Sequence, residues 1–221
     1  SGPIIDRNYK KKILVISDSI AAVSTIVLLI LFPILIISFC SAQVDSILSK
    51  KLIEMATLDQ EIMQNPPKSI KPASEEHMRL IDSIAAVNYQ EAKIIFEKYG
   101  FPGFDLVGEE GSKSFWLIVQ HCDKWPDFQR QVLEKMEIQV KNKNTHSKYY
   151  AYLVDRIRIR SGKKQLYGTQ VSYHTDICQA FVADVEDLDN LNKRRSAVGL
   201  ETIEEYLNIV SEHHFLRTDS S

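Results

Sequence analysis

Residues 112–141 read SKSFWLIVQHCDKWPDFQRQVLEKMEIQVK, and this stretch predicts two successive helices. Ser112 suits the start of a short helix that ends near Cys122. Pro126 suits the first turn of a second helix, which extends to about Lys141, because a proline loses no helical hydrogen bond at that position. The second helix places four apolar residues on its inner face, namely Phe128, Val132, Leu133 and Met136.

Further helices are expected on both sides of this stretch. Residues 44–63 carry an apolar stripe near helical period, and a linker with two prolines follows, up to residue 73. Ser74 suits the start of the next helix, and Asn88 with Glu91 resembles a capping box that opens another one. Near the C-terminus, helices are expected over 189–197 and 202–210.

A small β element is expected between these groups of helices. Residues 149–157 favour a helix or a helix that turns into a strand, and the alternation of Arg158 and Arg160 with isoleucines favours the solvated face of a strand. Residues 165–173 have the composition of a strand, and 180–185 suit its partner. The expected fold is therefore mainly α (α+β), a helical domain with a small antiparallel element near its C-terminus.

The N-terminal segment predicts export. Residues 20–39 contain no charge and are long enough to cross a bilayer as a helix, and Lys10, Lys11 and Lys12 precede them. The string Cys40-Ser41-Ala42 places small residues at both positions that a signal peptidase inspects and suits cleavage after Ala42, although an uncleaved anchor also fits the long apolar run. The body is then periplasmic or at the cell surface after cleavage, or anchored in the inner membrane and outside the cytoplasm.

These observations divide the chain into four parts. Residues 1–42 are expected to be a signal peptide or signal anchor, 43–73 a helix and linker, 74–212 a globular domain and 213–221 a tail. The whole chain has a formal net charge of −2, and residues 1–42 carry a surplus of two positive charges, so the remainder carries −4. An acidic body argues against nucleic-acid binding, which requires a surplus of lysine and arginine.

Several kinds of chemistry have no sequence signature here. The chain lacks CxxC and HExxH metal motifs, a P-loop and GxGxxG, so no metal and no cofactor is expected. The string Gly108–Gly111 encloses two glutamates that would repel phosphate. Cys122 and Cys178 are either a disulfide in an oxidising compartment or two small buried thiols.

The candidate functional residues are polar groups beside apolar stretches, where an unpaired polar side chain would be costly. Gln120, His121 and Asp123 follow the apolar run 115–119. His121 suits a general base, and a histidine tied to a backbone carbonyl at a helix end is the alternative. Since Asp155 and Arg156 are adjacent, each is expected to bond a different neighbour, either in a structural ion pair or in recognition of an anion.

The string Tyr167-Gly168-Thr169-Gln170 follows later in the chain. A glycine within a strand pattern signals a bulge or a close approach by backbone or ligand. With a bulge, the side chains of Tyr167 and Gln170 would face one pocket, and without one they would make ordinary cross-strand contacts.

Taken together, these strings resemble a bacterial domain family of unknown function, over roughly residues 75–207. The matching strings are Val119-Gln120-His121 with Asp123, Ala151-Tyr152-Leu153 with Asp155-Arg156, and Gln165 with Tyr167-Gly168-Thr169-Gln170. The chain departs from the family pattern at 173–178, where a more polar turn is expected. The resemblance implies no activity, because the family has none assigned.

Two functions fit these observations. One is a non-catalytic cell-envelope domain that binds a small ligand, a peptide or a partner protein through a polar pocket. The other is an envelope hydrolase or transferase with His121 as general base, Asp155 orienting it and Tyr167 donating to a developing oxyanion. The ligand-binding residues expected in either case are Gln120, Asp123, Arg156, Thr169 and Gln170.

Overall fold

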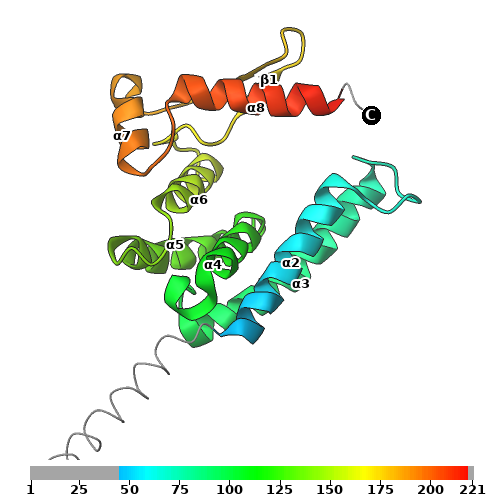
Figure 1. The fold of residues 1–221 in the computed structure, drawn as a ribbon. Coiled ribbons are helices and arrows are strands. Elements are labelled where there is room, and N and C mark those ends of the chain that lie inside the picture. Colours follow the sequence, from blue (N-terminus) through cyan, green and yellow to red (C-terminus); the bar gives the residue numbers. More distant parts are fainter. Residues whose placement is uncertain (1–44, 219–221) are drawn as a thin grey trace, which may run out of the picture. The chain divides into compact units, whose positions relative to one another are not determined.

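The computed structural model describes residues 45–218, which begin with a pair of helices, α2 (Ser46–Gln64) and α3 (Glu75–Tyr99). The two helices lie side by side (Figure 1) and are joined by the proline-containing connection. The N-cap of α2 is Asp45, whose side chain accepts from Leu48 N at 2.9 Å. Ser74 caps α3 by accepting from His77 N at 3.2 Å, which confirms the helix start expected there.

The second helix expected from Asn88 is wrong, because α3 continues through it. Asn88 is buried on the inner face of α3, in line with Ala85, Ala92 and Ile95. Its side chain bonds to Asp59 of α2 instead of capping a helix end. A capping-box pattern inside a helix is therefore compatible with packing when the asparagine finds a buried partner.

The next helix, α4 (Phe104–Gln120), begins earlier than the expected start at Ser112 and contains a kink. Gly108 has φ 71°, a left-handed conformation that glycine adopts readily, and it separates a first turn from the main body. Gly111 allows close packing, because a Cβ there would lie 2.8 Å from the Ser49 hydroxyl oxygen of α2. The glycines of 108–111 thus shape the contact between α2 and α4.

Two further helices follow as α5 (Pro126–Lys141) and α6 (Ser147–Arg160). Pro126 lies in the first turn of α5, as expected. The strand expected at Arg158 and Arg160 is wrong, since both lie in the last turn of α6. No glycine or proline lies between Pro126 and Gly162, so α6 continues through the alternating residues.

The small antiparallel sheet lies near the C-terminus, as expected. It consists of β1 (Ser172–His174) and β2 (Gln179–Phe181), with Tyr173 opposite Ala180. Both strands are shorter than expected. Residues 165–170 instead form a loop whose amide groups bond to a buried side chain, and this competes with a sheet ladder.

The chain ends in the short 3₁₀ helix η1 (Leu188–Asn190), α7 (Leu191–Ala197) and α8 (Ile203–Thr218). Helix α8 continues past residue 212, where a tail was expected, and lies along the hairpin (Figure 1). Ala180 N donates to the Ser211 hydroxyl at 2.7 Å, so α8 covers the outer edge of β2. The fold is mainly α with a small antiparallel element, as the sequence predicts.

The main core lies among α2, α3, α4, α5 and α6. Its fully buried members are Leu52, Ala92, Phe115, Val119, Val132, Met136 and Leu153. None of the helices between residues 45 and 218 has the length and apolar content needed to cross a membrane. The apolar run 20–39 lies outside the described residues.

Candidate functional site

The central feature of the candidate site is a histidine–carboxylate pair. His121 is the C-cap of α4, and its Nδ1 lies 2.5 Å from Asp59 Oδ2 of α2. The side chain of Asp59 is 5% exposed and that of His121 is 18% exposed. Because a carboxylate only accepts, the hydrogen bond places a proton on Nδ1, which leaves Nε2 as the nitrogen without a proton when the imidazole is neutral.

Nε2 of His121 receives no hydrogen bond from residues 45–218, and it is not among the buried unpaired atoms of that part of the chain. It therefore lies within reach of solvent. A base that is held at one nitrogen and open at the other is the arrangement that proton transfer requires. The pair differs from the expected alternative, in which a backbone carbonyl holds the histidine.

Asp59 was not among the site residues predicted from the sequence, although its place on the apolar stripe of a predicted helix indicates a buried carboxylate. It lies on the buried stripe of α2, in register with Leu48, Leu52 and Ala56. A carboxylate at such a position needs a buried partner. Asn88 of α3 supplies one, donating to Asp59 Oδ1 at 3.3 Å, and His121 supplies another.

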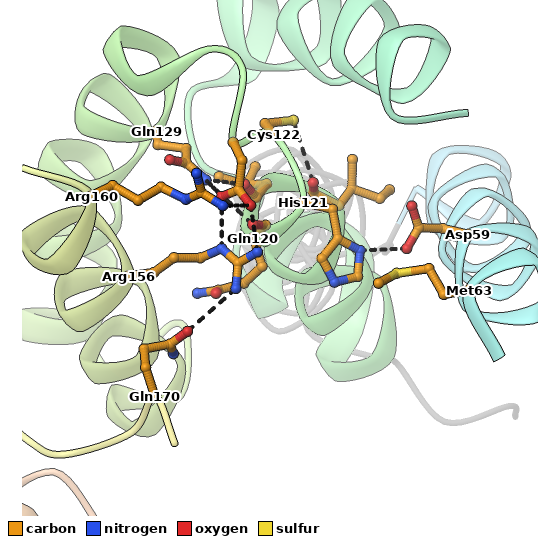
Figure 2. Close-up of polar contacts among 12 residues, drawn as sticks. Asp59, Met63, Gln120, His121, Cys122, Gln129, Arg156, Arg160 and Gln170 are labelled. Carbon is orange, nitrogen blue, oxygen red and sulfur yellow. Dashed lines mark hydrogen bonds and ion pairs between the residues drawn. The ribbon is translucent and has the colours of Figure 1, made fainter. Parts of the chain in front are cut away.

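A second cluster forms around Asp123, two residues after His121. Arg156 of α6 binds it with two donors, Nε at 2.8 Å and Nη2 at 2.7 Å, and Arg160 also pairs with it. Figure 2 shows both arginines reaching toward the α4–α5 turn while His121 points toward Asp59. Asp155 and Arg156 thus bond different neighbours, as expected for adjacent residues.

The Asp123 carboxylate is held ionised. Burial is the largest single influence and raises its pKa, but the Arg156 hydrogen bonds and charge, with the Arg160 charge and Gln129, outweigh burial. The net result is a pKa below the usual range. One carboxylate faces two guanidinium groups, so the cluster keeps a surplus of one positive charge.

Gln129 links this cluster to the end of α4, whereas Gln120 bonds to other residues of the protein interior. Gln129 Nε2 donates to Val119 O at 3.0 Å and lies 3.4 Å from Asp123 Oδ1. Gln120, with its oxygen turned toward the Trp116 indole, accepts from Nε1 at 3.1 Å. Since Gln120 is buried, its amide contributes to packing within the protein.

Asp155, expected to orient His121, holds a loop instead. It is fully buried and accepts from Leu166 N at 2.6 Å, from Tyr167 N at 3.1 Å and from Thr169 N at 3.0 Å. The Thr169 hydroxyl also donates to it at 3.0 Å. The structure therefore does not join Asp155 to His121, and Asp59 is the carboxylate that orients the histidine.

The opposite side of the same loop is held by Arg195 of α7. This residue is fully buried and donates to Tyr167 O at 2.7 Å, and its guanidinium lies 4.8 Å from the centre of the Tyr206 ring. Burial lowers the pKa of Arg195 and raises that of Tyr206. Tyr206 in turn donates to Thr169 O at 2.9 Å. The loop is thus fixed from both sides.

The remaining predicted residues divide between the two clusters. Thr169 is buried within the Asp155 cluster. Gln170 Oε1 accepts from Arg156 Nη1 at 3.3 Å, so Gln170 belongs to the Asp123 cluster. Tyr167 is half-buried, and burial followed by the charge of Asp155 raises its pKa. The Tyr167 amide is bound to Asp155, and no hydrogen bond joins Tyr167 to His121 within residues 45–218.

The described residues contain no group of histidine, cysteine and acidic side chains arranged to hold a metal ion. Both described cysteines are free, with Cys122 buried and Cys178 exposed, so only one of them fits the expectation of two buried thiols. Of the hollows on this part of the molecule, two are lined by residues near Gln170 and near Phe101, and His121 lines neither.

The chain forms a small helical domain with two buried or half-buried polar clusters. One lies at the end of α4, around Asp59, His121 and Asp123, and the other holds the loop 165–170 between Asp155 and Arg195. Residues 46–219 match the model of the family DUF6624, a family of unknown function, and the chain belongs to that family. No curated protein and no solved structure matches the chain.

Proposed function

We propose that this domain is an acid–base enzyme, a hydrolase or transferase, in which His121 moves a proton. The observation that carries the proposal is the 2.5 Å contact between His121 Nδ1 and the buried Asp59, with Nε2 left open. Asp59 keeps the imidazole in one tautomer and one orientation and balances the charge that forms when Nε2 accepts a proton.

Arg156 and Gln170 suit recognition of an anionic or polar part of the substrate. The side chain of Arg156 is 24% exposed, and the cluster around Asp123 keeps its surplus of positive charge. Because Asp123 follows His121 by two residues, the histidine and the Asp123 cluster lie at the same turn between α4 and α5. The arrangement would stabilise negative charge that develops during proton transfer.

The test is turnover of chromogenic substrates by the full chain in a non-ionic detergent. The panel comprises 4-nitrophenyl acetate, 4-nitrophenyl phosphate and 4-nitrophenyl glycosides. His121→Asn is expected to lower kcat about 100-fold or more, because general-base catalysis contributes at least that much. Asp59→Asn should lower kcat as well, since it disturbs the tautomer.

His146→Asn is the matched control, since His146 is a partly exposed histidine paired with Glu109 on the surface. Turnover that is equal in wild type and His121→Asn would end the proposal. Absence of turnover with every substrate of the panel would count for the binding domain described next.

The second candidate is a non-catalytic domain that binds a small ligand, a peptide or a partner protein. The observation that favours it is the saturation of most polar groups by one another, shown best by Asp155 and Thr169. In that case His121 would mainly hold α4 to α2. His121→Ala would then lower the free energy of unfolding by several kcal/mol. Each kcal/mol lowers the thermal midpoint of a domain of this size by about 2–4 °C.

For either function we propose a place in the cell envelope. Support comes from the uncharged run 20–39 after three lysines, and from the string Cys40-Ser41-Ala42, which places small residues at both positions that a signal peptidase inspects. Fractionation of cells that express the full chain tests this proposal. Recovery of the chain in the cytosolic fraction would contradict it.

A further inference from the structure

We infer that a hollow beside Gln170 is a binding site for a small organic molecule that carries a phosphate group. The hollow has a volume of about 580 Å³ and lies between the turn that ends α6 and the loops around residues 171 and 183. Its polar side chains include Lys163, Lys164 and Ser172. This inference goes beyond the proposed function, because binding needs no proton transfer by His121.

The walls of the hollow are fixed before any ligand arrives. Gln165, which is 1% exposed, lies at its base and donates to Gln170 O at 2.9 Å and to Ala183 O at 3.0 Å. Gln165 N also donates to Asp184 O at 2.7 Å. Because one buried residue bonds to both walls, the backbone around the hollow loses little conformational entropy when a ligand binds.

The turn at the end of α6 is equally well fixed. Lys163 N donates to Arg158 O at 2.9 Å, and Arg158 Nε donates to Lys164 O at 2.6 Å. The backbone of the two lysines is thus held in place while their ammonium groups are left exposed. Exposed ammonium groups on a fixed backbone suit capture of a phosphate as point charges.

The charges in this region also favour an anion. Neither Lys163 nor Lys164 forms an ion pair with any of residues 45–218, whereas Arg158 is paired with Glu186. Asp184 is the one acidic residue among those lining the hollow, so the lining carries a surplus of one positive charge. A positive hollow on an otherwise acidic body is a local feature that concentrates anions.

The volume indicates an organic phosphate and not the bare ion. Sites for small molecules typically occupy about 300–1,000 Å³, and this hollow falls within that range. The remainder of the ligand would contact the apolar part of the lining at Ile159 and Val171, and Asp184 and Ser172 can bond to its hydroxyl groups. A soluble phosphate ester and the headgroup of a lipid share this chemistry.

The hollow is also connected to the candidate site. Gln170 lines it and accepts from Arg156, which holds Asp123 two residues from His121. A ligand that displaces the Gln170 side chain would therefore change the partners of Arg156.

Isothermal titration of the full chain in non-ionic detergent tests the inference. The probes are glycerol 3-phosphate and dihexanoyl phosphatidic acid, with glycerol as the uncharged control. Lys163→Gln/Lys164→Gln is expected to weaken phosphate binding about tenfold or more, because two charge-assisted contacts are lost. The matched control is Lys68→Gln/Lys71→Gln, which removes two exposed lysines from the α2–α3 connection.

Saturable binding that the first double variant weakens and the control leaves unchanged supports the inference. Tighter binding of glycerol 3-phosphate identifies a soluble ligand, and tighter binding of the lipid identifies a headgroup. Binding of neither probe, or equal binding by both double variants, overturns it. If the thermal midpoint of Lys163→Gln/Lys164→Gln falls, Lys163→Glu replaces it in the comparison. The titration measures binding without turnover, so its outcome is independent of whether the proposed proton transfer by His121 takes place.

Discussion

Asp59 is the residue whose burial needs the most explanation. A carboxylate on the inner stripe of a helix loses its water, and the loss is tolerable only when other groups bond to it. Asn88 and Gln60 lie within 3.4 Å, and His121 lies at 2.5 Å. The shortest of these contacts goes to the ring of His121, whose second nitrogen receives no hydrogen bond within residues 45–218, and our proposal of a chemical role for this ring rests on that contact.

The two described cysteines should differ sharply in reactivity. Burial, followed by the charges of Asp59 and Asp123, raises the pKa of Cys122 to about 12, whereas Cys178 is exposed. Because the thiolate is the reactive form, an aromatic disulfide reagent at pH 8 should label Cys178 quickly and Cys122 only after unfolding. A Cys40→Ser background removes the third thiol. Fast labelling of Cys122 in the folded chain would contradict the burial described above.

The Asp123 cluster should make stability depend on acid. The pKa of Asp123 is lowered in the folded chain. Its contribution to the free energy of unfolding is therefore fully present above the pKa of an unfolded aspartate, about 3.9, and is lost as the pH falls through the folded pKa. In that window the unfolded chain binds more protons, and the free energy of unfolding decreases with falling pH. The difference in thermal midpoint between wild type and Asp123→Asn should therefore shrink below about pH 4.

Asp127→Asn provides the comparison for that measurement. Asp127 pairs with Arg130 within one exposed turn of α5, and exposed pairs contribute little. Its variant should have nearly the wild-type midpoint at every pH. A difference for Asp123→Asn that stays constant from pH 7 to pH 2 would show that the ion cluster does not contribute as described.

At the scale of elements, the loop 165–170 depends on one helical residue. Asp155→Asn would replace the carboxylate that accepts from four donors by a neutral amide and remove one of the negative charges that act on the buried Arg195. Breaking a buried charged network costs about 3–5 kcal/mol. The thermal midpoint of the full chain should fall by about 6 °C or more. Asp184→Asn, at an exposed position, should change it little.

The elements also show what the sequence could predict. Helices with a clear cap or a proline in the first turn were predicted well, as at Ser74 and Pro126. The errors arose where a side chain satisfied the backbone in place of a sheet ladder, as in 165–170, or where Asn88 bonded across helices. Local patterns cannot distinguish these cases, because the partner residues lie far away in the sequence.

At the scale of the whole domain, the polar residues around Asp59 and Asp123 connect several helices to one another. Asp59 connects α2 and α3 to the end of α4, and Asp123 connects the α4–α5 turn to α6 and to Gln170. The sequence identified His121, Asp123, Arg156 and Gln170, which come together at or beside one turn. It placed Asp155 with them incorrectly and missed Asp59, because the apolar stripe of α2 indicates that Asp59 needs a buried partner but does not identify that partner, which lies 62 positions away.

The central claim is that Asp59 holds His121 with its proton on Nδ1 and its Nε2 free. The most direct measurement is a long-range ¹H–¹⁵N correlation spectrum of the full chain labelled at histidine, with His121→Asn used for assignment. We predict an Nδ1–H tautomer for neutral His121 in the wild type and loss of that preference in Asp59→Asn. An Nε2–H tautomer, or a His121 signal that Asp59→Asn leaves unchanged, would contradict the account.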